Sequence, residues 1–190
     1  MPRSPAQFEA MRQASQEKIL KSAVKLFAQY GFQATTISMI ARDSDLSGGL
    51  VYAYYEDKEK LLDCVLAQTF TKLDVLFADE TIRASVTWPF AERVTLAFDT
   101  IMLRVDCFQL LVQLMMQEGT PPAAIEQIRK LSLYCKNKLS EIFPEQAARH
   151  LPGMIHAAIT SYLVFHNSEL FEQQREAIRQ LSSTLQERQN

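Results

Sequence analysis

Residues 35–58 read Thr35-Thr36-Ile37-Ser38-Met39-Ile40-Ala41-Arg42-Asp43-Ser44-Asp45-Leu46-Ser47-Gly48-Gly49-Leu50-Val51-Tyr52-Ala53-Tyr54-Tyr55-Glu56-Asp57-Lys58 and are the most informative segment of the chain. It predicts two short helices joined by a tight turn. Thr36 and Ser47 are good N-caps, because each hydroxyl can accept a hydrogen bond from a free amide in the first turn of a helix. Asp45 falls in the turn at a position that needs a positive φ, which Asp tolerates better than most residues.

The flanking sequence predicts further helices on both sides. Upstream, apolar residues recur with the 3.6-residue period of an amphipathic helix at Ile19, Leu20, Ala23, Val24, Phe27 and Tyr30. We expect Gly31 to end this helix as a left-handed C-cap, and residues 1–14 to be a mobile arm. Downstream, Asp57 is expected to cap a fourth helix that is too long to serve only the first domain.

This pattern resembles the helix-turn-helix of TetR-type (TetR/AcrR) transcriptional regulators. The resemblance covers residues 15–65, roughly a quarter of the chain. It implies an all-α fold, with a three-helix DNA-binding domain and N-terminal arm in residues 1–62 and a helical ligand-binding and dimerisation domain in residues 63–190. The matching residues are Thr35-Thr36-Ile37, Ile40-Ala41, Leu46-Ser47, Gly49-Leu50, Tyr52, Tyr54-Tyr55 and Lys58-Glu59 with Leu61-Leu62, preceded by Ile19-Leu20, Ala23, Leu26-Phe27 and Gly31-Phe32.

The resemblance implies that the second short helix reads double-stranded DNA in a major groove. Leu50 and Ala53 can contact a thymine methyl, and backbone amides at Ser47, Gly48 and Gly49 can meet a phosphate. Gly48 stands where the family usually has a basic residue. The resemblance also implies that the hydroxyls of Tyr52 and Tyr54 bind phosphates, and packing is the alternative role for these two side chains. Thr36, Arg42 and Lys58 are expected to clamp the DNA backbone.

Charge leaves a second class of function open. The chain has a formal net charge of −2, and residues 1–63 carry eight Lys or Arg against eight Asp or Glu. Because phosphate contacts supply much of the affinity for DNA, a neutral domain offers only a thin basic patch. The alternative is therefore a protein-binding adaptor of the same fold with weak or lost DNA binding.

Composition excludes several other classes. Apolar residues make up 47% of the chain, so a packed core is expected. No export signal, no membrane span, no cofactor motif, no metal-ligand spacing and no catalytic constellation is discernible, so we expect a cytoplasmic protein that is not an enzyme. The three cysteines form no C-x-x-C motif and are expected to be reduced, buried thiols: Cys64, Cys107 and Cys135.

The middle of the chain is rich in aromatic residues and Met. We expect a linker over Thr81 to Pro89, then helices from Phe90 to about Arg104, Asp106 to Gln117 and Pro121 to Phe143. Two interpretations of the apolar concentration are open: an ordinary core, or a cavity for a small apolar ligand, as the resemblance implies. The expected ligand-binding residues are Phe70, Phe98, Met102, Phe108, Leu111, Met115 and Tyr134.

The last two expected helices, about Pro152 to Phe165 and Ser168 to Gln186, predict a homodimer. The first is apolar over more than one stripe and needs cover on two sides, which a four-helix bundle with a second copy provides. The expected interface residues are Ile155, Ile159, Tyr162, Leu163, Ile178, Leu181 and Leu185. Together with the resemblance, this pattern predicts a repressor that a small apolar molecule releases from a palindromic operator.

Overall fold

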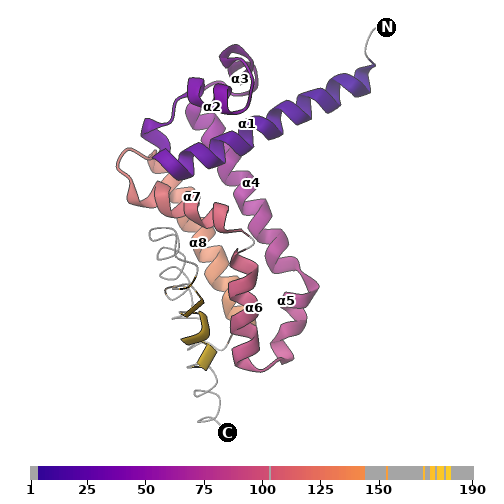
Figure 1. The fold of residues 1–190 in the computed structure, drawn as a ribbon, viewed down its shortest axis with the longest axis vertical. Coiled ribbons are helices and arrows are strands. Elements are labelled where there is room, and N and C mark those ends of the chain that lie inside the picture. The colour runs from indigo at the N-terminus through magenta and orange to yellow at the C-terminus, as the bar shows by residue number, and fades with distance from the viewer. Residues whose placement is uncertain are drawn as a thin grey trace. The chain divides into compact units, whose positions relative to one another are not determined.

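The computed structural model describes residues 4–102 and 104–143, together with residues 153, 169, 172–173, 175–177 and 179–180. Every regular element in these ranges is helical, which confirms the all-α fold class (Figure 1). Within them, no helix combines the length and the apolar character that crossing a membrane requires. In chain order the elements are α1 (Pro5–Ala34), α2 (Ile37–Asp43), α3 (Gly48–Tyr54), α4 (Lys58–Ala78), α5 (Glu80–Ala84), the 3-10 turn η1 (Ser85–Thr87), α6 (Phe90–Met102), α7 (Val105–Met116) and α8 (Pro122–Ile142).

Helix α1 begins ten residues before the predicted start, so the mobile arm expected over residues 1–14 is wrong for residues 5–14. A capping box starts the helix: the Ser4 hydroxyl accepts from the Gln7 amide at 3.3 Å, and the Gln7 side chain accepts from the Ser4 amide at 2.9 Å. Pro5 occupies the first turn, where its missing N–H costs nothing. The apolar periodicity that predicted the helix does not register these capping signals.

Gly31 kinks α1 instead of ending it. Its φ of 78° is positive, as expected, but its ψ of 177° lies far from the left-handed helical region. This backbone conformation is essentially restricted to glycine. The helix resumes through Ala34, and the buried Thr35 hydroxyl donates to the carbonyls of Leu26 and Gly31 at 3.1 and 2.7 Å. The end of α1 is therefore held by side-chain hydrogen bonds.

The contacts of the chain group it into two compact units, and residues 110–128 belong with residues 1–69 in the first. One apolar core joins six helices there, α1, α2, α3, α4, α7 and α8. Phe27, Ile40 and Val51 of the first three helices are fully buried in it, and so are Leu110 and Leu114 of α7. No pattern in the sequence predicts that part of α7 and α8 completes this core.

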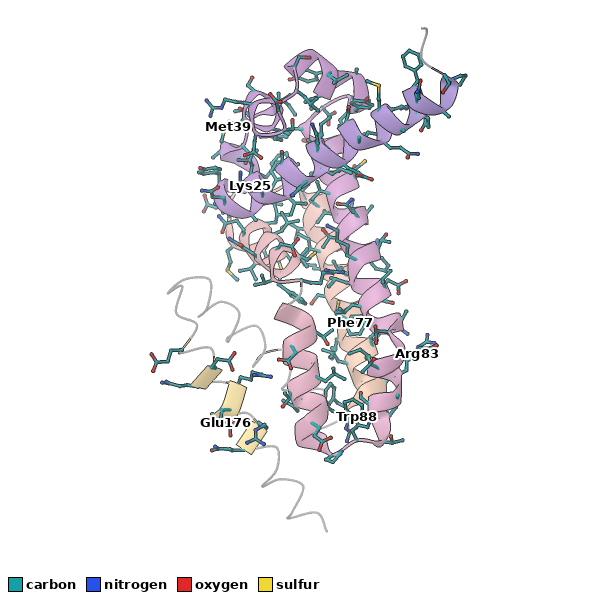
Figure 2. All side chains as sticks on the ribbon, turned by 45° about the vertical axis from the view of Figure 1, so that its right-hand side comes forward. Lys25, Met39, Phe77, Arg83, Trp88 and Glu176 are labelled. Carbon is teal, nitrogen blue, oxygen red and sulfur yellow. The ribbon has the colours of Figure 1, made fainter. Side chains whose placement is uncertain are left out.

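The second unit, residues 70–109 and 129–190, contains the segment that we expected to be a linker. That expectation is wrong, because α5 and η1 occupy residues 80–87. The Asp79 carboxylate accepts from the Thr81 amide at 2.8 Å and caps α5, and Ile82 is buried. Figure 2 labels Phe77 and Trp88, which lie on either side of this segment in the chain. The buried Ser85 hydroxyl also donates to the Ile82 carbonyl at 2.6 Å, so a cap, two buried side chains and this bond hold the short helical segment in place.

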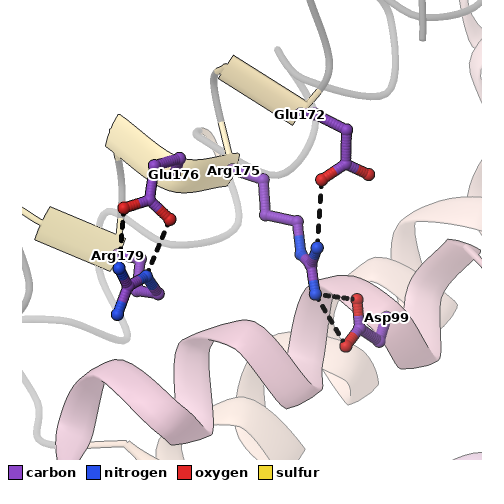
Figure 3. A network of polar contacts seen from close by, with 5 residues as sticks. All are labelled: Asp99, Glu172, Arg175, Glu176 and Arg179. Atoms are coloured by element: carbon purple, nitrogen blue, oxygen red, sulfur yellow. Dashed lines mark hydrogen bonds and ion pairs between the residues drawn. The ribbon is translucent and has the colours of Figure 1, made fainter. Parts of the chain in front are cut away.

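A carboxylate on helix α6 forms an ion pair with an arginine in the C-terminal part of the same unit. The Arg175 guanidinium lies 2.7 Å from the Asp99 carboxylate and 3.0 Å from that of Glu172 (Figure 3). In the next helical turn Arg179 pairs with Glu176 at 2.7 Å and holds the pKa of Glu176 down at about 2. All of these side chains are at least partly exposed, so each pair contributes little to stability.

The three cysteines differ in exposure. Cys107 is buried, Cys135 is half-buried, and burial raises the pKa of both thiols to about 11. Cys64 is exposed, so the expectation of three buried thiols is wrong for this residue. Its position on α4 explains the difference, because the buried face of the helix is formed by Leu61, Leu62, Val65 and Leu66, and Cys64 lies outside that face.

Candidate nucleic-acid interface

The turn between α2 and α3 has the geometry that the sequence predicted. Asp45 has a φ of 56°, the only positive φ outside glycine in the described residues. The Leu46 amide donates to the Ala41 carbonyl at 2.9 Å and the Asp45 amide to the Arg42 carbonyl at 3.3 Å. These two bonds are the Schellman pattern that ends a helix at a left-handed residue. Asp45 thus fills the position that usually requires glycine.

Side-chain caps fix the start of both helices. The Thr36 hydroxyl accepts from the Met39 amide and the Ser47 hydroxyl from the Leu50 amide, each at 3.2 Å. As predicted, Asp57 caps α4 by accepting from the Lys60 amide at 2.7 Å. Each capping hydroxyl uses its oxygen for the backbone, so its proton stays free to be donated to a phosphate oxygen.

Helix α3 divides its residues between the core and solvent. Val51 is fully buried, while Gly49, Tyr52 and Ala53 are exposed, with 57% of Tyr52 open to solvent. Tyr54 is half-buried and packs against the core of the first unit. Its ring lies 6.5 Å from that of Tyr55, so packing explains much of its position. Of the two tyrosines, Tyr52 has the freer hydroxyl for a ligand.

The two glycines that open α3 leave space around the helix start. A Cβ atom added at Gly48 or Gly49 would meet no other atom within 4 Å. Neither glycine has a positive φ, so neither is required by the backbone. Packing within the chain therefore does not require glycine at these two positions. The lack of side chains allows another surface to approach the start of α3 closely.

Few free cations surround this face. Arg42 on α2 is exposed and has no ion-pair partner among the described residues. Lys25 on α1, labelled in Figure 2, pairs instead with Asp43 at 2.5 Å. The hydrogen bond from Lys25 lowers the pKa of the Asp43 carboxyl. Pairing of Lys25 with Asp43 thins the already sparse basic patch that the charge count predicted, and Arg42 remains an exposed cation on α2.

Lys58 has a contact that the sequence did not predict. Its ammonium donates to the carbonyls of Phe32, Gln33 and Thr35 at 2.8, 3.3 and 2.9 Å, and it lies 4.3 Å from the centre of the Phe32 ring. Burial lowers the pKa of this amine. An ammonium has three protons, so all three are used inside the protein. The phosphate clamp expected of Lys58 would require at least one of these bonds to break.

The expected ligand residues fall in both units. In the second unit, the rings of Phe70 and Tyr134 lie 4.9 Å apart, and the Tyr134 hydroxyl donates to Asp74, which raises the pKa of Tyr134 to about 12. In the first unit, Leu111 packs against the core and Met115 is 48% exposed. The side chains of Phe98 and Met102 lie outside the described part of the structure, and Phe108 is half-buried. A shared cavity stays a prediction.

The expected dimer interface lies outside the described residues altogether. This applies to each residue in the set Ile155, Ile159, Tyr162, Leu163, Ile178, Leu181 and Leu185. The homodimer therefore stays a prediction from the apolar pattern of the sequence.

Comparison with known proteins agrees with this geometry. Residues 19–65 match the family model described as "Bacterial regulatory proteins, tetR family". YhgD, an uncharacterized HTH-type transcriptional regulator from Bacillus subtilis (strain 168), is 29% identical over 131 residues. That match covers 65% of this chain and 66% of YhgD, so the chain spans just under two thirds of this relative.

Solved structures of regulators share the fold. The transcriptional regulator FadR from Bacillus subtilis in complex with stearoyl-CoA superposes with a TM-score of 0.65 and 16% identity, over 88% of this chain and 97% of that one. A transcriptional regulator from Aquifex aeolicus VF5, described as of the TerR/AcrR family, gives a TM-score of 0.60 and 20% identity, over 88% of this chain and 99% of that one. These findings show that residues 19–65 match the TetR family in the helix-turn-helix, and that the chain shares the fold of solved transcriptional regulators.

Proposed function

We propose that this chain is a DNA-binding transcription regulator that acts as a homodimeric repressor and is released from its operator by a small apolar molecule. The observation that carries the proposal is the solvent-facing side of α3. Gly49, Tyr52 and Ala53 are exposed on a helix whose start is fixed by Ser47, and Arg42 on the preceding helix is exposed with no ion-pair partner in the described part of the chain. This is a surface of the right length and chemistry to enter a major groove.

The DNA part of the proposal is tested by selection. Purified protein is mixed with fragmented genomic DNA at low salt, and the retained fragments are sequenced. The matched variants are Tyr52→Phe, which removes one exposed hydroxyl, and Arg42→Ala, which removes one free cation. If the two changes together leave operator affinity unaltered, the assigned surface is wrong.

The sparse charge of the interface favours one alternative, an adaptor that binds protein through this face. It differs from the leading proposal in its response to salt. Binding of DNA through Arg42 should weaken as salt rises, with a slope of log K against log salt of about −0.9 for each phosphate contacted. An adaptor should select no fragment from the genomic pool, even at low salt.

The dimer has its own test, because reading a palindrome requires a two-fold partner. We expect a dimer at micromolar concentration, and monomers that no longer bind the operator after Ile159→Glu with Leu181→Glu. Sedimentation of the wild type as a monomer, or of the double variant as a dimer, would overturn this interface. The DNA-reading residues are untouched by the change, so a loss of binding reports on assembly.

The effector should be apolar because aromatic and aliphatic side chains dominate the expected ligand residues, including Phe70 and Leu111. Stearoyl-CoA in the FadR structure is a compound with a long apolar chain, which supports this choice of class. A thermal-shift screen across a hydrophobic compound library tests it, and the absence of any shift would refute it. We also propose that the protein acts on chromosomal DNA in the cytoplasm and that it catalyses no reaction.

A further inference from the structure

Two short segments of the first unit mirror each other in sequence. Gly31-Phe32-Gln33 ends α1, and Gln117-Glu118-Gly119 forms the turn between α7 and α8. Each segment contains one glycine with a positive φ and one glutamine two residues away. In the structure each glutamine reaches the region of the other segment's glycine. We call these four residues, Gly31, Gln33, Gln117 and Gly119, the glycine–glutamine latch.

The first half of the latch places Gln117 directly on Gly31. The side-chain amide nitrogen of Gln117 donates to the Tyr30 carbonyl at 3.4 Å. A Cβ atom at Gly31 would lie 1.2 Å from Oε1 of Gln117, so any side chain there would displace the end of Gln117 from its place. The φ of 78° requires glycine at this position, and the glycine in turn leaves the space that Gln117 occupies.

The second half repeats this arrangement in the opposite direction. The side-chain amide nitrogen of Gln33 donates to the Gly119 carbonyl at 2.8 Å. A Cβ atom at Gly119 would lie 2.4 Å from Cγ of Gln33, and the φ of Gly119 is 83°. The α7–α8 turn is thus fastened to the end of α1 by two side chains that run in opposite directions.

The segment that the latch holds leads directly into the helix-turn-helix. Thr36, the N-cap of α2, follows Gln33 by three residues. Lys58 of α4 binds three carbonyls of the same segment. Behind the latch, Leu114 of α7 and Ile128 of α8 are buried in the core that also holds α2 and α3. A displacement of the α7–α8 turn must therefore move the end of α1 or break the latch.

We propose that the glycine–glutamine latch couples the conformation of the α7–α8 turn to that of the DNA-reading helices. This proposal rests on the proposed function, because it takes DNA as the ligand that binds those helices. Coupling between two sites is reciprocal, so DNA bound at α3 must change the α7–α8 turn by the same factor as the turn changes DNA affinity. The α7–α8 turn can therefore be monitored without knowing the small molecule.

The test is hydrogen exchange of the full chain with and without an operator fragment from the selection. In the wild type, DNA should slow exchange in residues 36–54 and also in residues 117–121. In the double variant Gln33→Ala with Gln117→Ala, DNA should still protect residues 36–54 but leave residues 117–121 unchanged. The matched control is Gln29→Ala, an exposed glutamine on the same helix, which should behave as the wild type does.

Each outcome decides the proposal. Protection of residues 117–121 that survives in the double variant, or that is missing in a wild type that binds DNA, overturns it. If the wild type binds no DNA at all, the proposed function fails, and the DNA-free chain then decides whether the latch exists. The double variant should speed exchange in both residues 31–36 and residues 117–121 by about fivefold, the factor that one hydrogen bond contributes to an equilibrium. An unchanged rate in either segment refutes the latch.

Discussion

Replacing Lys58 by Met separates two roles for this residue, a phosphate clamp and a support for the end of α1. Met keeps the length and apolar character of the stem. What is lost is the ammonium, with its three bonds to backbone carbonyls and its contact with the Phe32 ring. The substitution therefore probes the interactions of the ammonium.

The size of the effect follows from the geometry. A hydrogen bond from a charged donor contributes about 1.5–3 kcal/mol. Two of the three bonds, at 2.8 and 2.9 Å, are short enough to count fully, and the third, at 3.3 Å, is weaker. Water can replace part of what is lost, and the burial that lowers the pKa of Lys58 opposes the bonds. We expect a net loss of about 2 kcal/mol, or a fall in Tm of about 4–8 °C for a chain of this size.

The assay combines urea unfolding, followed by far-UV circular dichroism, with operator binding at several salt concentrations. Lys58→Met should lower the unfolding midpoint and leave the salt slope unchanged. The control is Arg42→Met, an exposed cation with no ion-pair partner among the described residues. It should keep stability within about 0.5 kcal/mol and reduce the slope by about 0.9. If Lys58→Met instead preserves stability and reduces the slope by that amount, Lys58 is a phosphate clamp and the reasoning is wrong.

Three further predictions concern the start of α3, the core and high pH. Gly48→Ala should stabilise the helix by about 1 kcal/mol. Because the site is open, Gly48→Lys should in addition tighten binding to many DNA sequences and steepen the salt slope by about 0.9. Weaker binding by the Lys variant would count against the proposed orientation of α3 toward DNA. Leu114→Ala should cost about 3 kcal/mol in urea unfolding and speed hydrogen exchange in α2 and α3, whereas Leu133→Ala, at a side chain that is 58% exposed, should do neither; unchanged exchange in α2 and α3 would mean that α7 is not part of their core. Burial raises the pKa of Tyr55 to about 12, so its contribution is complete below pH 10 and is lost as pH rises from 10 to 12, on the order of 2 kcal/mol; Tyr55→Phe should remove this part of the alkaline loss of Tm, and identical curves for the two proteins would refute it.

The elements that the sequence predicted well are those whose interactions are local. Thr36, Ser47 and Asp57 cap the helices that follow them, because the amide each one binds is three residues away. Asp45 has the positive φ that its place in the turn required. The start of α1 at Ser4 also has a local signal, the capping box, but apolar periodicity does not register it because residues 5–14 lie outside the apolar stripe.

The contacts that the sequence could not reveal join residues that lie far apart along the chain. Lys58 binds carbonyls 23 to 26 residues before it, and Gln33 binds a carbonyl 86 residues after it. A lysine after an aspartate, or a glycine near a glutamine, gives no sign of such a partner. The inclusion of residues 110–128 in the first unit has the same origin.

The helix-turn-helix, its caps and its turn follow from the sequence alone, because helix period and capping act over a few residues. Tertiary packing sets which of the candidate cations form ion pairs within the described residues, what holds the end of α1, which helices share a core, and that Tyr54 packs against that core. These depend on how distant segments pack, since a side chain such as Lys58 satisfies whichever acceptors the fold brings within its reach. Sequence therefore specified the surface that we propose reads DNA, and tertiary packing specified how that surface is supported.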